Sequence, residues 1–139
     1  MKISILDVFG MELNDDVRTI EYAKALPICD DGQLEIDFSK CIIDYPATSK
    51  IADAAFERIE KGASPRNLTF IFNIGFPERM FLKWFFFGSR RLGLDEGTAT
   101  EEEIRNKLTE SLKNIGAVLH IKIQNPQTQA VVQEFRYGE

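Results

Sequence analysis

The chain has 139 residues, of which 44% are hydrophobic and 28% charged. These values are typical of one folded domain and argue against disorder. Its formal net charge of −5 disfavours general binding to nucleic acid or to anionic membranes, because both of those surfaces are negative. Cys29, Cys41 and His120 are too few for the ligand set of a usual zinc site, so we expect no metal and no cofactor.

The apolar segments give no sign of export or of membrane insertion. The start of the chain lacks the apolar run and the cleavage site of a secretory signal. The longest apolar cluster, Met80–Gly88, is interrupted by Lys83 and is much shorter than a membrane span. We therefore expect a cytoplasmic protein.

The first half of the chain alternates strand and helix patterns. Lys2–Phe9 reads as a strand that ends at Gly10, and Asn14 is a candidate cap for the helix that follows. That helix has apolar residues at helical spacing, namely Val17, Ile20, Ala23 and Leu26. A short strand over 34–38 then leads to a helix that Thr48 or Ser49 could cap, with its apolar stripe at Ile51, Ala52, Ala55, Phe56 and Ile59 and a stop at Gly62.

The second half begins with Asn67–Ile74, which is almost wholly apolar and predicts a central strand buried on both faces. A helix is expected from Pro77 to about Arg91, and another from the capping box at Thr100 to Gly116. Val118–Ile123 and Ala130–Tyr137 predict a terminal β-hairpin. The order predicts a single α/β domain over residues 1–139, with a mixed sheet of about five strands packed by about four helices.

Known catalytic motifs are missing from the chain. Neither of the common glycine-rich phosphate loops occurs, nor does a GxSxG nucleophile elbow. Asp37 and Asp44 lie at or beyond the carboxyl end of the second strand, where α/β sheets place ligands, and Cys41 lies between them. A cleft there would suit a small ligand-binding domain or an enzyme, whereas each aspartate could equally accept hydrogen bonds from turn amides.

Aromatic residues concentrate between Phe70 and Phe87. On the expected third helix, Phe81, Trp84 and Phe85 share one face and suit the core, whereas Leu82 and Phe86 form a second apolar row that suits an interface. This row makes a structural homodimer a further alternative.

The stretch Leu34–Ser49 resembles the STAS-like domains related to bacterial anti-sigma factor antagonists. The resemblance rests on a strand ending in Asp37-Phe38-Ser39, an apolar segment at Ile42-Ile43, and the hydroxyl residues Thr48 and Ser49 at the expected helix start. Family members carry an Asp-Ser pair and a glycine at that helix start, but here Asp44 is followed by Tyr45 and Pro46. The resemblance therefore implies that Thr48 or Ser49 would be the phosphorylated hydroxyl.

These features together favour a non-enzymatic regulatory or protein-interaction module. The resemblance implies a protein partner such as an ATPase-type kinase or another signalling protein. We expect this partner to bind at the second helix start, around Asp44 and Tyr45, and at the apolar row of Leu82 and Phe86. A phosphate at a helix start would add about −1.5 to −2 charges to that surface. The same hydroxyls could instead serve only as helix caps.

Overall fold

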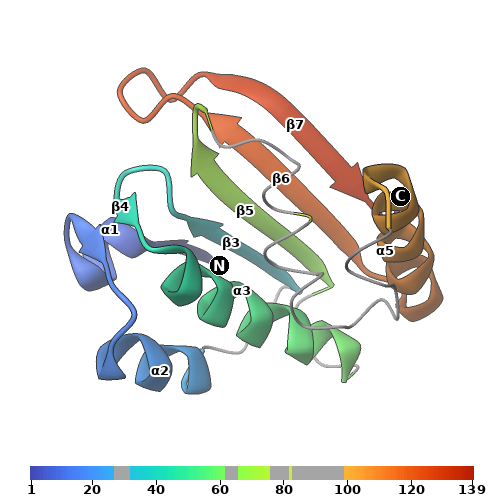
Figure 1. The fold of residues 1–139 in the computed structure, drawn as a ribbon, viewed down its shortest axis with the longest axis horizontal. Helices are drawn as coiled ribbons and strands as arrows, with labels where there is room; N and C mark the ends of the chain where they lie inside the picture. Colours follow the sequence, from blue (N-terminus) through green and yellow to red (C-terminus); the bar gives the residue numbers. More distant parts are fainter. Residues whose placement is uncertain (27–31, 62–65, 76–81, 83–98) are drawn as a thin grey trace.

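A computed structural model describes residues 1–26, 32–61, 66–75, 82 and 99–139. Its main sheet has the strand order β1-β3-β5-β6-β7 (Figure 1). These strands are β1 (Lys2–Ser4), β3 (Gln33–Asp37), β5 (Asn67–Asn73), β6 (Val118–Gln124) and β7 (Val131–Tyr137). The first four strands in this order pair in parallel, and β7 pairs antiparallel to β6 as the terminal hairpin.

The described helices are α1 (Ile5–Phe9), α2 (Val17–Lys24), α3 (Tyr45–Glu60) and α5 (Glu101–Ile115). A second, two-stranded sheet joins β2 (Glu12–Leu13) to β4 (Ile42–Ile43) in parallel. Over the described residues, the architecture is the predicted α/β fold with a mixed five-stranded sheet and four helices, although α1 was not among the expected helices. The expected helix at Pro77–Arg91 lies outside the described residues.

One face of the main sheet carries the core. Ile36, Phe70 and Ile121 are paired across three neighbouring strands, and each has no exposed surface. Helix α3 buries its predicted apolar stripe in the same core, and α5 adds Leu108 and Leu112. Because side chains alternate across a strand, the residues between these apolar ones point to the other side of the sheet.

That opposite side, which we call the polar face, carries two rows of mainly polar side chains. The first row runs across the strands through Ser4, Asp37, Ile71, Lys122 and Glu134, and the second through Lys2, Glu35, Thr69, His120 and Arg136. The prediction that β5 is buried on both faces is correct for Ile71, which is 5% exposed, but Thr69 is only half-buried.

The N-terminal element differs from the predicted strand over Lys2–Phe9. The strand ends at Ser4, and Ile5–Phe9 forms a short helix that closes at Gly10, where φ is +83°. A short apolar run fits strand and helix patterns equally well, and only Lys2–Ser4 have partners on β3.

Two helix starts also differ from the prediction. Helix α2 is capped by Asp16 rather than Asn14, and α3 is capped by Asp44 rather than by Thr48 or Ser49. Asp44 precedes Pro46, a residue that favours the first turn of a helix, so the helix starts one turn earlier than expected. At α5 the predictions are confirmed, since Thr100 accepts a hydrogen bond from the Glu103 amide at 3.2 Å and Gly116 closes the helix with φ +66°.

Candidate functional site

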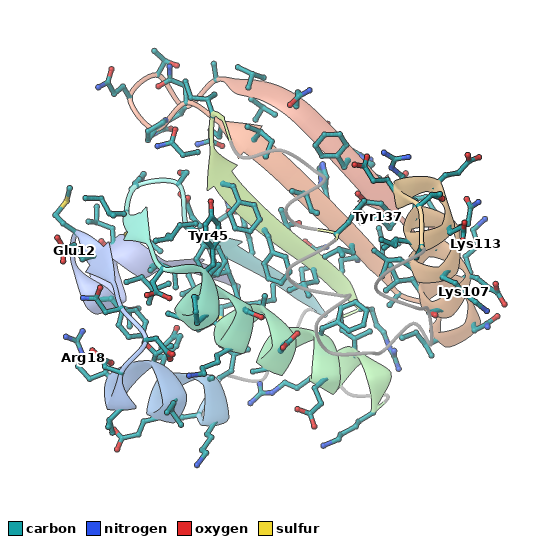
Figure 2. The ribbon with its side chains drawn as sticks, in the orientation of Figure 1. Glu12, Arg18, Tyr45, Lys107, Lys113 and Tyr137 are labelled. Carbon is teal, nitrogen blue, oxygen red and sulfur yellow. The ribbon has the colours of Figure 1, made fainter. Side chains whose placement is uncertain are left out.

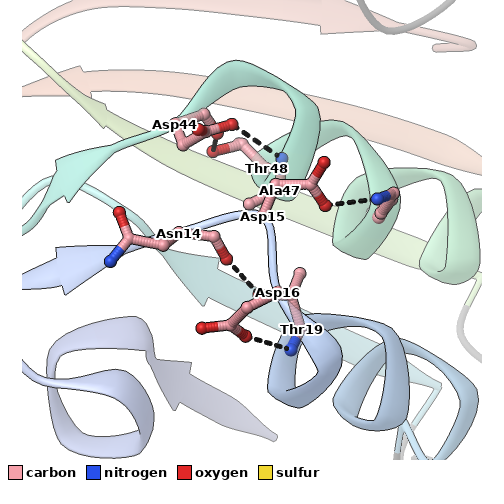
Figure 3. Close-up of polar contacts among 8 residues, drawn as sticks. Asn14, Asp15, Asp16, Thr19, Asp44, Ala47 and Thr48 are labelled. Carbon is pink, nitrogen blue, oxygen red and sulfur yellow. Dashed lines mark hydrogen bonds and ion pairs between the residues drawn. The ribbon is translucent and has the colours of Figure 1, made fainter.

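The start of α3 is held together by hydrogen bonds of its first turn (Figure 3). Asp44 Oδ1 accepts a hydrogen bond from the Ala47 amide at 3.2 Å, as expected of an N-cap. The Thr48 hydroxyl donates to the Asp44 carbonyl oxygen at 2.8 Å, and Thr48 has no exposed surface. Its hydroxyl is therefore inaccessible to a kinase while this turn is folded. Ser49 is half-buried.

The start of α2 lies beside the start of α3 (Figure 3). Asp16 Oδ1 caps α2 by accepting from the Thr19 amide at 3.2 Å, while the Thr19 hydroxyl donates to the Asn14 carbonyl oxygen. Asp15 forms an ion pair with Lys50 of α3, which links the two helix starts. The two helices are in direct contact.

Helix α2 leaves much of its apolar stripe exposed. Val17 is 66% and Ile20 40% exposed, although their spacing predicts a buried face. Ile20 contributes to a shallow groove of about 430 Å³ between α2 and α3. The groove is lined by Ile20, Ala23, Lys24, Lys50, Asp53, Ala54 and Glu57. Its lining combines one isoleucine and two alanines with four charged side chains.

A second hollow, which we call the polar cleft, lies on the polar face near the carboxyl ends of the parallel strands. Its volume is about 480 Å³. Its lining comes from β1, α1, β3, the loop after β3, β5, β6 and the hairpin loop, and comprises Lys2, Ile3, Ser4, Asp7, Glu35, Asp37, Lys40, Ile71, Lys122, Gln124 and Gln129. Open α/β sheets usually place ligands at this edge.

Asp37 lies in the polar cleft, but the other residues proposed with it do not line it. Its Oδ1 accepts hydrogen bonds from the Ser39 amide at 2.8 Å and from the Ser39 hydroxyl at 2.5 Å, which is the turn role anticipated for it. Asp44 caps α3, where its Oδ1 accepts the hydrogen bond from the Ala47 amide. Cys41 is half-buried, and its thiol donates to the Gly10 carbonyl oxygen at 3.3 Å.

The electrostatic environment of Cys41 opposes a nucleophilic role. Burial raises the pKa of the Cys41 thiol, and the carboxylates of Asp37 and Asp7 raise it further. The thiol therefore stays protonated at neutral pH, whereas the thiolate is the reactive form. His120 lies on β6 and faces Arg136 and Glu134 of β7, so the structure does not pair it with Cys41.

The side chain of His120 is largely buried, with only 15% of its surface exposed. Burial lowers the pKa of His120, and the positive charge of Arg136 lowers it further. Its Nε2 lies 3.7 Å from Glu134 Oε2 and accepts no hydrogen bond from the described residues. At neutral pH the imidazole is uncharged.

Two of the predicted partner-binding residues are directed inward. Leu82 was expected in an interface, but it has no exposed surface and belongs to the core. Tyr45 is half-buried and packs against the same core, and Figure 2 shows it where α3 meets the strands. Phe86 and Cys29 lie outside the described residues.

No protein-family model, curated protein or solved structure matches the chain. Within the described ranges, no helix is long and apolar enough to cross a membrane. The same part of the chain holds no group of three or more side chains that could bind a metal ion.

Sequence reasoning missed the α2–α3 groove, and of the polar cleft it anticipated only the position near the strand end and Asp37. The groove depends on α2 packing on α3 with Val17 and Ile20 turned outward, which the helical spacing alone does not predict. The polar cleft depends on the strand order of the sheet. Lys122 lies on β6, which pairs with β5, and β5 in turn pairs with the strand that carries Asp37. The one available signal was the position of Asp37 at a strand end.

Proposed function

We propose that the chain is a non-catalytic protein-interaction module of the cytoplasm, and that it binds its partner through the groove between α2 and α3. The observation that carries this proposal is the exposure of Val17 and Ile20, at 66% and 40%, on a helix whose apolar stripe is otherwise typical of a buried face. Ile20 lines the groove, and Val17, one helical turn before it on α2, extends the exposed apolar surface from Ile20. Exposed apolar patches of this kind are characteristic of binding surfaces.

The shape of the groove favours an amphipathic helix of the partner as the occupant. Ala23 and Ala54 are small, so a third helix can come close to both α2 and α3. Ile20 and Val17 would contact the apolar side of that helix, as in other helix-in-groove complexes. Asp53 and Lys50, which also line the groove, would contact its polar side.

The STAS-like resemblance adds a signalling partner, such as an ATPase-type kinase, and a regulatory phosphate. We place the proposed phosphate on Ser49 rather than on Thr48, whose hydroxyl is buried and hydrogen-bonded. Ser49 and Asp53 are separated by one helical turn and share a side of α3, and Asp53 lines the groove. A phosphate at Ser49 would add about −1.5 to −2 charges beside Asp53. The added negative charge would weaken the binding of an acidic partner helix and strengthen the binding of a basic one.

The test is photo-crosslinking in the native cell from a benzoylphenylalanine placed at position 17. Val132 is 56% exposed on β7 and provides a matched control position away from the groove. We expect one protein to crosslink from position 17 and not from position 132, and to bind the purified chain in an equimolar complex. The same crosslinks from both positions, or none from position 17, would refute the groove as the docking surface.

The regulatory step is tested separately with the purified complex. We expect Ser49→Glu to change the affinity for the crosslinked protein while Ser49→Ala leaves it unchanged. If both variants bind as the wild type does, the proposed phosphate switch is wrong and the docking proposal is unaffected.

A further inference from the structure

The polar cleft has charges of both signs that do not form ion pairs with one another. Three lysines, Lys2, Lys40 and Lys122, line it together with three carboxylates, Asp7, Glu35 and Asp37. Throughout the described ranges, none of the three lysines forms an ion pair or a side-chain hydrogen bond. Their ammonium groups are therefore available to a ligand.

The charges are distributed unequally along the cleft. Asp7, Glu35 and Asp37 lie at the β1–β3 end with Lys2 and Lys40, which leaves that end with a net charge of −1 from three negative and two positive groups. The β6 end has Lys122 with the neutral side chains of Gln124 and Gln129, and so has a net charge of +1.

Lys122 stays unpaired although Glu134 lies directly opposite it on β7. The Glu134 carboxylate oxygen Oε2 instead approaches His120 at 3.7 Å and Arg136 at 3.8 Å. The three side chains thus form a group of their own next to the cleft, and Lys122 remains the cation of its β6 end.

An apolar side chain lies between the two ends. Ile71 of β5 is paired with Asp37 on one side and with Lys122 on the other, and it forms part of the cleft lining. Since neighbouring strands lie about 4.8 Å apart, the main chains at Asp37 and Lys122 are roughly 10 Å apart. The cleft therefore has a negative end and a positive end, and between them lies the small exposed part of Ile71, which is 5% exposed.

We propose that the polar cleft binds a small zwitterion whose ammonium and acidic groups are separated by a short apolar chain, as in an ω-amino acid. The ammonium group would lie at the Asp7–Asp37 end and the acidic group at Lys122, with the methylene chain over Ile71. The amides of Gln124 and Gln129 would donate hydrogen bonds to the acidic group. This site is separate from the α2–α3 groove and does not depend on the proposed protein partner.

The test is a titration of the full chain with ε-aminocaproic acid, followed in amide NMR spectra. We expect saturable shifts on β3, β5 and β6 near the cleft. Caproic acid and hexylamine each have only one of the two charges. Each should bind at least about tenfold more weakly than ε-aminocaproic acid. Equal binding of caproic acid would show a simple anion site, and the absence of saturable shifts would show no site, so either result overturns the proposal.

Substitutions at the two ends of the cleft test which end binds the ammonium group of the ligand and which binds its acidic group. Lys122→Gln should weaken binding of ε-aminocaproic acid at least about fivefold and leave any residual binding of hexylamine unchanged. Asp7→Asn should weaken hexylamine and the zwitterion together; Asp7 is exposed on α1, so the variant is expected to fold. Lys113→Gln is the matched control, because Lys113 lies on α5, away from the cleft (Figure 2). An equal effect of Lys122→Gln and Lys113→Gln would contradict the proposed orientation.

Discussion

The hydroxyl of Thr48 donates a hydrogen bond to the carbonyl oxygen of Asp44 at 2.8 Å, across the first turn of α3 and with no exposed surface at Thr48. This contact joins the residue that the STAS-like resemblance implies as a switch to the residue that caps the helix. It makes Thr48 a structural residue, whereas its neighbour Ser49 reaches the surface.

Thr48→Glu is predicted to destabilise the fold by about 3 kcal/mol or more, because it buries a carboxylate without a partner. Ser49→Glu is the matched variant one residue later, and we expect it to change the free energy of unfolding by no more than about 0.5 kcal/mol. Urea unfolding of both variants measures the difference. Equal stability of the two variants would show that the first turn of α3 opens readily.

Asp44→Ala should lower the free energy of unfolding by about 1 kcal/mol, because the Ala47 amide loses its acceptor. Asp44→Asn keeps an acceptor at the same place and should cost only a few tenths of a kcal/mol, through the lost charge at the helix start. Chemical unfolding of both variants checks this prediction, which fails if alanine and asparagine are equivalent.

Acidification should destabilise the chain through His120. Its pKa in the folded state is lowered, first by burial and then by Arg136, so below pH about 6.5 the unfolded chain binds a proton that the folded chain does not. The stability present above that pH is therefore lost as the pH falls from 6.5 to the lowered folded pKa. Lys122 acts in the same direction as Arg136, and Glu134 and Glu139 oppose them.

The chain has one histidine, so a single imidazole resonance reports this pKa directly. Arg136→Gln should raise the pKa of His120 and Glu134→Gln should lower it further. The loss of stability on acidification should be smaller in His120→Gln than in the wild type. A wild-type pKa above 6.5 would reverse the sign and contradict the account.

The aromatic core gives a prediction about packing. Phe38 and Phe72 stack with their ring centroids 5.4 Å apart, and neither is more than 1% exposed. Phe72→Ala should lower the free energy of unfolding by about 3–5 kcal/mol. Phe9 is half-buried beside Tyr22, with ring centroids 5.3 Å apart, so Phe9→Ala should cost clearly less in the same unfolding assay.

The sequence predicted those parts of the fold that depend on local chemistry. The Thr100 cap, the Gly116 stop and the apolar stripe of α3 all follow from residue type and spacing, and the structure confirms them. The prediction of a strand over Lys2–Phe9 was wrong, because the apolar spacing of this run fits both a strand and a helix. Pairing with β3 decides where the strand ends.

The candidate sites depend on contacts between segments that are distant in the sequence. Local sequence patterns do not predict such contacts. The outward position of Val17 follows from α2 packing on α3, and the approach of Asp37 to Lys122 follows from the order of strands. Leu82 shows the opposite error. Its place in an apolar row suggested an interface, but the side chain is buried in the core with no exposed surface.

Docking at the α2–α3 groove is tested by the affinity of the purified chain for the protein that crosslinks at position 17, compared between Val17→Glu and Val132→Glu. Both valines are more than half exposed, at 66% and 56%, so neither variant should disturb the fold. We expect Val17→Glu to weaken binding about tenfold or more, while Val132→Glu binds as the wild type does. Equal affinity of the two variants would contradict the α2–α3 groove as the binding surface.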